Sequence, residues 1–269
     1  MRGEQAQEVK TSCFVYPDVA DRITERVIES FGEEAWRIEE EYVLYEAMRC
    51  INNDKIRVRF ILDAGCGTGR LFYIIRRIKN DEMFGVDIDP SRLAKASAMA
   101  HKLGNTIHLI CADLSKIALN IKCDVIICSH VLQHVSRRCA IEILKNFKRL
   151  LNRRGLLVLM VSKSSSNEYY LMVKKRGRNV ISQKIDAKTF DSLCLKNKPG
   201  LLMVRKFDIL KLRQDLERLG FKVLKVYSYH VKIPFRHPIL HWITVRIVNL
   251  IPFLKRKLGI DALIICRRR

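Results

Sequence analysis

Apolar residues recur along this chain with two different periods. Between residues 18 and 50 they recur every three or four positions, which predicts helices. From residue 59 onward, short runs rich in valine and isoleucine alternate with helical patterns. The predicted strands of this region are 59–65, 82–89, 106–113, 123–129 and 156–162, and the predicted helices are 69–80, 91–104 and 140–151. This βα alternation predicts a parallel sheet with helices on both faces.

The rhythm changes after the fifth predicted strand. The stretch 163–203 is polar and basic without a firm period, and 232–258 is apolar and basic together. The elements predicted around them are a helix at 209–220 and strands at 221–231 and 261–269. We expect residues 1–56 to form a helical lid or substrate cap. Residues 57–269 are expected to form one domain with basic insertions at about 163–203 and 232–258.

Residues 61–70 read ILDAGCGTGR, in which an apolar strand leads into a glycine-rich turn. Such a turn before a helix presents backbone N–H groups to a ligand. A nicotinamide dinucleotide site requires G-x-G-x-x-G, but Gly65, Gly67 and Gly69 give G-x-G-x-G, followed by Arg70. A P-loop would require Gly-Lys-Ser/Thr, which this turn lacks. Asp63, two residues before the first glycine, suits a ligand that carries a cationic group.

The next predicted strands also end in polar residues. Asp87 lies near the end of the second strand, Asp113 near the end of the third, and Ser129 at the end of the fourth. Ligands of open parallel sheets bind at the carboxyl ends of the strands, so these segments should converge on one crevice. An acid at the tip of the second strand can accept hydrogen bonds from both ribose hydroxyls, and Asp113 is placed to meet an exocyclic amine.

The stretches ILDAGCGTGR, FGVDIDPSRL, ICADLSKI, DVIICSHVLQHV and LLNRRGLLVLMV together resemble the class I S-adenosylmethionine-dependent methyltransferases, particularly the group that acts on small molecules and lipids. The resemblance implies a Rossmann-like, doubly wound α/β fold. Its seven-stranded sheet would be mostly parallel with the last strand antiparallel, and here an N-terminal helical lid would be added. The implied cofactor is S-adenosylmethionine.

The same resemblance implies which residues bind that cofactor. They are Asp63, Gly65, Cys66, Gly67, Gly69, Asp87, Ile88, Asp113, Leu114 and Ser129. The glycines would hold the methionine part, with Asp63 toward its ammonium group. Asp87 would bind the ribose hydroxyls and Asp113 the adenine amine. Ile88 would pack against the adenine, the Leu114 N–H would reach a ring nitrogen, and Ser129 would line the methionine side.

Methyl transfer from a sulfonium is an in-line displacement, so the enzyme chiefly aligns the reactants and excludes water. A general base is needed only when the acceptor must lose a proton. His134 is our candidate, with His130 as the other, because both follow the tip of the fourth strand and imidazole titrates near neutrality. No carboxylate accompanies these histidines at ligand spacing, so we expect no metal site.

The acceptor is expected to be a small or lipid-like molecule methylated on oxygen or carbon. The aromatic residues Tyr16, Trp36, Tyr42 and Tyr45 of the lid either wall its pocket or pack the lid itself. The net charge is +22, and residues 163–269 hold 25 basic but only 7 acidic side chains. Such an excess attracts phosphates, so the alternative is an RNA or protein methyltransferase, and a non-catalytic cofactor-binding subunit is a third reading.

The segment 236–257 has apolar residues at helical spacing and basic residues around them. It could lie against an anionic membrane surface or form a core-facing helix pair broken at Pro252. No window of about 18 residues is free of charge, so no membrane-spanning segment is expected. A polar start and the absence of paired CxxC spacing predict a cytoplasmic protein, peripheral at the membrane if the segment is interfacial. The pattern predicts no oligomeric state.

Overall fold

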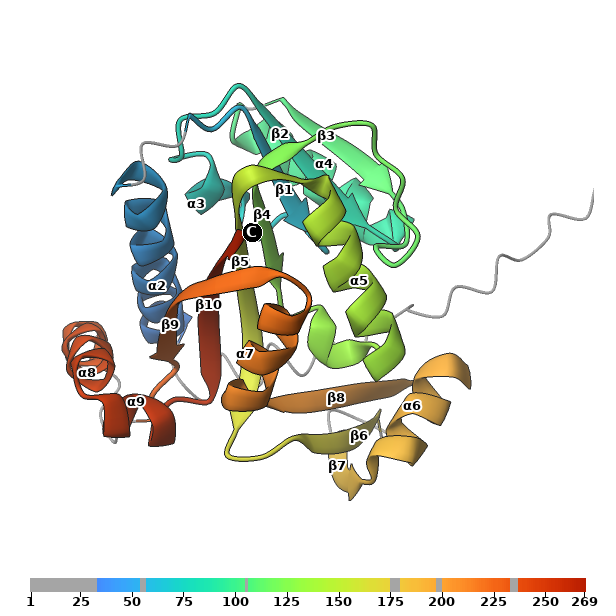
Figure 1. Cartoon of the computed structure of the whole chain (residues 1–269), viewed down its shortest axis with the longest axis vertical. Helices are drawn as coiled ribbons and strands as arrows, with labels where there is room; N and C mark the ends of the chain where they lie inside the picture. The colour runs from blue at the N-terminus through green and yellow to red at the C-terminus, as the bar shows by residue number, and fades with distance from the viewer. Residues whose placement is uncertain (1–32, 54–56, 105, 175–179, 197–199, 233–236) are drawn as a thin grey trace, which may run out of the picture.

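The computed structural model describes residues 33–53, 57–104, 106–174, 180–196, 200–232 and 237–269. The predicted helical pattern at 18–32, Tyr16 and Arg236 lie outside these ranges. Within these ranges, ten strands join into one continuous sheet (Figure 1). Seven of them form the predicted central part, and three form an extension at one end.

The central part has the strand order β3-β2-β1-β4-β5-β10-β9. Its strands are β1 (Phe60–Ala64), β2 (Glu82–Asp87), β3 (Ile107–Cys111), β4 (Cys123–Ser129), β5 (Leu151–Ser164), β9 (Phe221–Tyr229) and β10 (Asp261–Arg268). The five strands from β3 to β5 run parallel to their neighbours, and β10 lies antiparallel between β5 and β9. This confirms the predicted fold class, including the antiparallel last strand.

Helices cover both faces of this sheet, and each face has its own hydrophobic core. One core includes apolar residues of α2 (Glu33–Asn53), α3 (Phe72–Ile75), α4 (Pro90–Lys102) and α8 (Pro238–Leu250), and the other includes those of α5 (Arg137–Leu150) and α7 (Ile209–Arg218). The helix predicted at 69–80 is much shorter than expected. It ends after Ile75, and the N–H groups of Asp81 and Glu82 soon bind the Arg59 carbonyl at the entry to β2.

An extension that the sequence did not predict follows β5. It consists of β6 (Glu168–Lys174), β7 (Val180–Ile185), α6 (Ala187–Lys196) and β8 (Leu201–Asp208). β6 lies between β7 and β8 and pairs antiparallel with both, and β8 also pairs in parallel with the last two residues of β5, Lys163 and Ser164. Side chains on both faces of β6 and β8 are packed, so these two strands lack the apolar-polar alternation that would have revealed them.

The helix α2 is anchored to α8 and β9 by buried polar contacts. Glu39 Oε1 lies 2.6 Å from His241 Nδ1, and Glu39 Oε2 accepts a hydrogen bond of 3.0 Å from the Val231 N–H. Burial raises the pKa of Glu39 to about 8. Tyr227 of β9 donates to Glu46 at 3.1 Å. These contacts fix α2 beside α8 and β9, at the β9 end of the central sheet (Figure 1).

Candidate functional site

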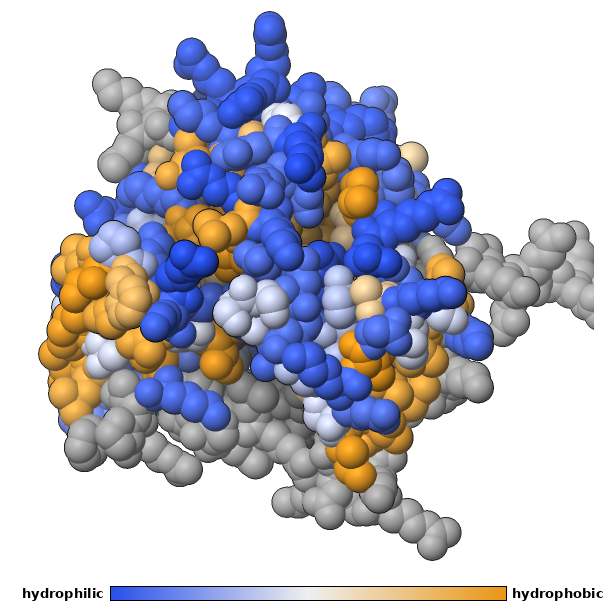
Figure 2. Space-filling view, turned by 60° about the horizontal axis from the view of Figure 1, so that its bottom comes forward, coloured by the Kyte–Doolittle hydropathy of each residue, from blue (hydrophilic) through white to orange (hydrophobic). Residues whose placement is uncertain are grey.

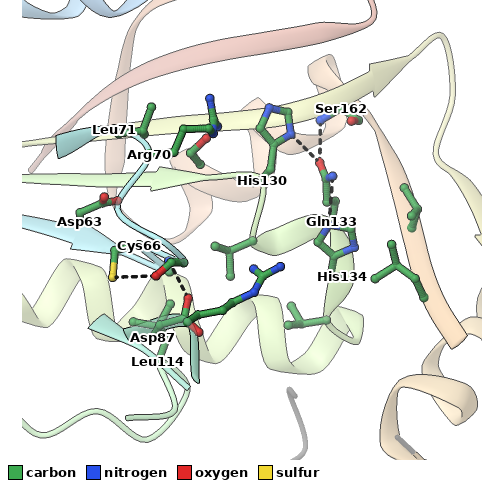
Figure 3. Close-up of a pocket in the computed structure, with 18 of the residues that line it drawn as sticks. Asp63, Cys66, Arg70, Leu71, Asp87, Leu114, His130, Gln133, His134 and Ser162 are labelled. Carbon is green, nitrogen blue, oxygen red and sulfur yellow. Dashed lines mark hydrogen bonds between the residues drawn. The ribbon is translucent and has the colours of Figure 1, made fainter. Parts of the chain in front are cut away.

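A cavity of about 530 Å³ opens where the parallel strands end. The tips of β1, β2 and β4 and the segment after β3 form one side of it, and strands β6 and β8 of the extension form the opposite side. The predicted site residues on its wall are Asp63, Gly65, Cys66, Gly67, Asp87, Ile88, Asp113, Leu114, Ser129 and His134. Figure 3 shows the labelled members of this wall facing one another across the cavity.

The glycine turn brings bare backbone to the cavity. Gly65 has φ +79°, a left-handed conformation that favours glycine, and an added Cβ would lie 2.1 Å from Val131 Cγ2. The N–H groups of Gly65 and Cys66 both donate to the Val86 carbonyl, which attaches the turn to the end of β2. Gly69 is the only predicted cofactor residue away from the described wall: its missing Cβ leaves room for the Phe72 ring.

Asp63 is a buried carboxylate without a local partner. Asp63 is the last residue but one of β1 and is 1% exposed, and neither of its carboxylate oxygens has a hydrogen-bond partner among the described residues. Burial raises its pKa to about 7, a shift that the nearby Arg70 charge reduces and the Asp87 charge increases. A buried, unpaired carboxylate is costly unless a cation or donor neutralises it. The position therefore fits a ligand that carries a cationic group.

Asp87 and Asp113 each combine a structural role with remaining acceptor capacity. Asp87 Oδ2 accepts from the Gly67 N–H at 2.8 Å, and Oδ1 accepts from the Asp89 N–H at 3.0 Å. Each carboxylate oxygen has a second lone pair for a ligand hydroxyl. Asp113 Oδ1 accepts from the backbone and side chain of Ser115, while its buried Oδ2 has no partner in the described structure. That oxygen suits a ligand amine.

The side chains of His130, Gln133 and His134, which directly follow β4 in the sequence, form a hydrogen-bonded network. Backbone groups at its edges determine where the protons lie. The Ser162 N–H donates to Gln133 Oε1 at 3.0 Å, so the amide nitrogen of Gln133 faces His134 Nε2 at 3.2 Å. His134 Nδ1 lies 2.9 Å from the Met203 carbonyl and must carry the proton. His134 is therefore a neutral ring that donates through Nδ1 and accepts through Nε2.

His130 lies at the other end of this hydrogen-bonded network, across Gln133 from His134. Its Nδ1 lies 3.1 Å from Gln133 Oε1, and its Nε2 lies 3.2 Å from the buried Tyr229 hydroxyl. Because Gln133 Oε1 can only accept, His130 Nδ1 donates to it, and Nε2 is paired with the Tyr229 hydroxyl. The backbone of His130 has φ +56°, an uncommon value for a residue other than glycine. The sequence signal for this residue was its place directly after a strand tip.

The ring of His134 should stay neutral across the physiological range. Burial lowers its pKa to about 4, although the hydrogen bond to Met203 opposes the shift. Ring-nitrogen NMR spectra recorded from pH 5.5 to 8 should therefore show one Nδ1–H tautomer without a titration step. The His134 signals would be assigned by their loss in His134→Asn. A midpoint above pH 6 would contradict this arrangement, because an ordinary histidine titrates near 6.5.

Several cavity residues were not predicted from the sequence. Asp261 is 2% exposed, accepts from Ser162 Oγ at 2.9 Å, and lies 2.7 Å from His230 Nδ1. Burial opposes its ionisation, but His130, His230 and Ser162 hold its pKa below the usual range. An acid that opens the otherwise apolar strand DALIIC was the available signal. Gln133, Ser162, Lys206 and the apolar β8 residues carried no comparable signal.

The aromatic residues predicted for the lid separate into two groups. Trp36 lines the cavity and stacks on His230 with ring centroids 3.3 Å apart. Tyr42 packs against the hydrophobic core, and Tyr45 is 57% exposed. Among the described lid aromatics, Trp36 is therefore the one placed to contact a ligand.

Comparison with known proteins supports the resemblance read from the motifs. Residues 61–155 match a family model described as a methyltransferase domain. A putative methyltransferase of Encephalitozoon cuniculi (strain GB-M1) is 29% identical over 119 residues, which is 44% of this chain. This chain covers 52% of that relative, about half of its length.

Solved structures with the same fold include enzymes with different substrates. An S-adenosylmethionine-dependent methyltransferase from Clostridium acetobutylicum matches with TM-score 0.57 and 12% identity over 87% of this chain and 92% of its own. Burkholderia thailandensis 1,6-didemethyltoxoflavin-N1-methyltransferase, with 1,6-didemethyltoxoflavin and S-adenosylhomocysteine bound, matches with TM-score 0.53 and 15% identity over 100% and 93%. Magnesium protoporphyrin IX methyltransferase from Synechocystis, with S-adenosylhomocysteine bound, matches with TM-score 0.55 and 16% identity over 93% and 94%.

Proposed function

We propose that this chain, whose residues 61–155 match the methyltransferase domain model, transfers a methyl group from S-adenosylmethionine to a small or lipid-like organic acceptor. The observation that carries the proposal is the unpaired Asp63 carboxylate beside a glycine turn in the cavity. Of the ligands considered for such turns, a nucleoside with an amino-acid tail offers both a cationic ammonium group and ribose hydroxyls. The described residues fit that ligand at each of its parts.

The proposed roles of the cofactor-binding residues follow from their surroundings. Asp63 would neutralise the ammonium group, and the turn at Gly65 and Gly67 would let the methionine part approach the backbone. Asp87 would bind the ribose hydroxyls with its remaining lone pairs, and Asp113 Oδ2 would accept from the adenine amine. Bound S-adenosylmethionine supplies an electrophilic methyl group on a positively charged sulfur.

The acceptor would occupy the part of the cavity that faces the extension. Met172, Leu202 and Val204 give this side an apolar wall, and Lys206 adds a cationic group. Opposite them lie the polar residues His130, Ser162 and Asp261. An apolar body with one oxygen or nucleophilic carbon fits this mixture. Two solved structures of the same fold are enzymes named for 1,6-didemethyltoxoflavin and magnesium protoporphyrin IX, which supports a small-molecule acceptor for this chain.

We propose that His134 holds the acceptor side of the cavity in place. It does not take a proton from the methyl acceptor. Its Nδ1 proton is held by the Met203 carbonyl, and its Nε2 lone pair is held by Gln133. With a pKa of about 4, it is also a weak base at neutral pH. Asp261, also on the cavity wall, has a pKa below its usual range, so it too would be a weak base at neutral pH.

Calorimetric titration and an acceptor screen test this proposal together. The purified chain should bind S-adenosylmethionine and S-adenosylhomocysteine and should not prefer a nicotinamide dinucleotide. Incubation with methyl-labelled cofactor and separate pools of small molecules, lipids, RNA and protein should label one of the first two pools. Labelling confined to RNA or protein would establish the alternative acceptor class. Cofactor binding without labelling of any pool would favour a non-catalytic subunit, and failure to bind the cofactor would refute the assignment.

A further inference from the structure

Helices α8 and α9 (Pro252–Lys257) expose an unusual number of large apolar side chains. Leu250 is 79% exposed, Phe253 62% and Ile239 60%. The full set, which we call the α8–α9 face, is Ile239, Leu240, Trp242, Ile243, Ile247, Leu250, Ile251, Phe253 and Leu258. These side chains gather on one side of the molecule (Figure 2). A contiguous apolar surface of this kind marks a contact with another molecule.

The opposite side of α8 already fastens the helix to the protein. His241, Val245 and Val248 are buried, with His241 paired to Glu39 of α2. Asn249 exchanges two hydrogen bonds with the backbone of Ser228, at 2.8 and 2.7 Å. Ile243 and Ile247 lie one turn apart on the outer side, 40% and 48% exposed. The core-facing alternative raised by the sequence therefore applies to the inner side alone.

Every charged residue from 237 to 258 is basic, because this stretch contains no aspartate or glutamate. The Arg246 guanidinium lies 4.6 Å from the centroid of the Trp242 ring, and Lys257 Nζ lies 4.5 Å from that of Phe253. Arg256 is exposed beside them. Basic groups in contact with aromatic rings are typical of protein surfaces that lie at the boundary between lipid headgroups and acyl chains. Tryptophan and basic residues are enriched at that boundary.

We propose that the α8–α9 face binds the surface of an anionic lipid bilayer. Each basic residue near such a surface raises the partition coefficient about fivefold, and the apolar side chains add their own transfer free energy. A second copy of this chain is a poorer partner, because a two-fold contact would bring the same basic residues together. No described helix is long and apolar enough to cross a bilayer, which makes the contact a peripheral one.

The α8–α9 face adjoins the cavity through the segment that links α9 to β10. Leu258 belongs to the face, and Ile260 and Asp261 belong to the cavity wall. Lys163 fixes this link: its ammonium group donates to the carbonyls of Lys255 and Leu258 at the end of α9. A bilayer bound here would lie beside the acceptor side of the cavity. The contact itself does not depend on the proposed methyl transfer.

Vesicle cosedimentation of the full chain tests the proposal. The protein should bind vesicles of phosphatidylcholine with about 30% phosphatidylserine, and at least tenfold less of it should bind pure phosphatidylcholine. Ile243→Asp with Ile247→Asp should reduce binding to the anionic vesicles by tenfold or more. The matched control is Ile141→Asp with Leu210→Asp, which adds the same charge at similarly exposed positions on α5 and α7 and should bind nearly as the unaltered chain does.

Trp242 offers a readout that needs no destabilising substitution. Bromine-labelled lipid should quench its fluorescence on binding, and Trp242→Phe should abolish that part of the quenching because Trp36 is buried. The proposal is overturned if the unaltered chain ignores anionic vesicles, if both double variants lose binding equally, or if Trp242 is not quenched. A concentration-dependent dimer that the Ile243/Ile247 variant dissociates, without vesicle binding, would identify the face as a contact between copies.

Discussion

Replacing Asp87 by alanine should weaken the binding of S-adenosylmethionine by about 1.5–3 kcal/mol, or roughly 10- to 150-fold in Kd. The substitution removes the proposed charged acceptor for the ribose hydroxyls. It also releases the Gly67 N–H, which the carboxylate holds at 2.8 Å, so the glycine turn loses part of its support. Isothermal titration calorimetry with S-adenosylmethionine measures the change.

Asp89→Ala provides the matched control for that measurement. Asp89 lies two residues away, carries the same charge and is also buried, but it faces the start of α4 and is not part of the cavity wall. Losing this N-cap should cost about 1 kcal/mol in the free energy of unfolding while leaving the Kd for the cofactor nearly unchanged. Equal losses of affinity in both variants, or none in Asp87→Ala, would exclude the proposed role of Asp87.

Replacing Asp63 by asparagine should change stability and cofactor binding in opposite directions. In the free protein the pKa of Asp63 is raised from 3.8 to about 7, so the folded state holds this proton more tightly than the unfolded state. Its contribution to stability is greatest below pH 4 and is lost as the pH rises toward 7. Once the carboxylate is ionised, its burial costs on the order of 4 kcal/mol. Asparagine avoids that cost but cannot neutralise an ammonium group.

Urea denaturation at several pH values measures the effect on stability. The unfolding free energy of Asp63→Asn minus that of the unaltered protein should rise by about 2–3 kcal/mol between pH 5 and pH 8. Saturating S-adenosylmethionine should remove this trend, since a nearby ammonium keeps Asp63 ionised. The variant should also bind the cofactor more weakly at pH 8. A difference that stays flat with pH would mean that Asp63 is already paired in the free protein.

The parts of the fold that were predicted well from the sequence are those whose structure is determined mainly by hydrophobic burial. The central strands are buried on both faces, so they appear as continuous apolar runs such as residues 156–161. The α3 helix was overpredicted because residues 76–80 keep a helical pattern while the chain turns toward β2. Periodicity records which side chains are apolar, but it does not record this competition for backbone hydrogen bonds.

The side of the cavity proposed for the cofactor could be predicted from the sequence, because its glycine turn and acids lie at the ends of predicted strands. The acceptor side could not, because it is built from distant segments. Gln133 meets Ser162, and His134 meets Met203, only through the pairing of β5 with β4 and β8. Asp261 reaches the same wall from the last strand. Such contacts depend on tertiary structure, which no local pattern in this sequence encodes.

The position of β10 between β5 and β9 has a consequence for how the chain folds during synthesis. Residues 156–162 of β5 must pair with residues 261–267, so one edge of β5 stays without its partner until about a hundred more residues are made. At typical translation rates of about 5–20 residues per second, that interval lasts roughly 5–20 s. During this interval the six apolar residues LLVLMV have unpaired backbone N–H and C=O groups along one edge. A strand of another chain could pair with that edge. We therefore expect aggregation of nascent chains to depend on how quickly the ribosome delivers β10.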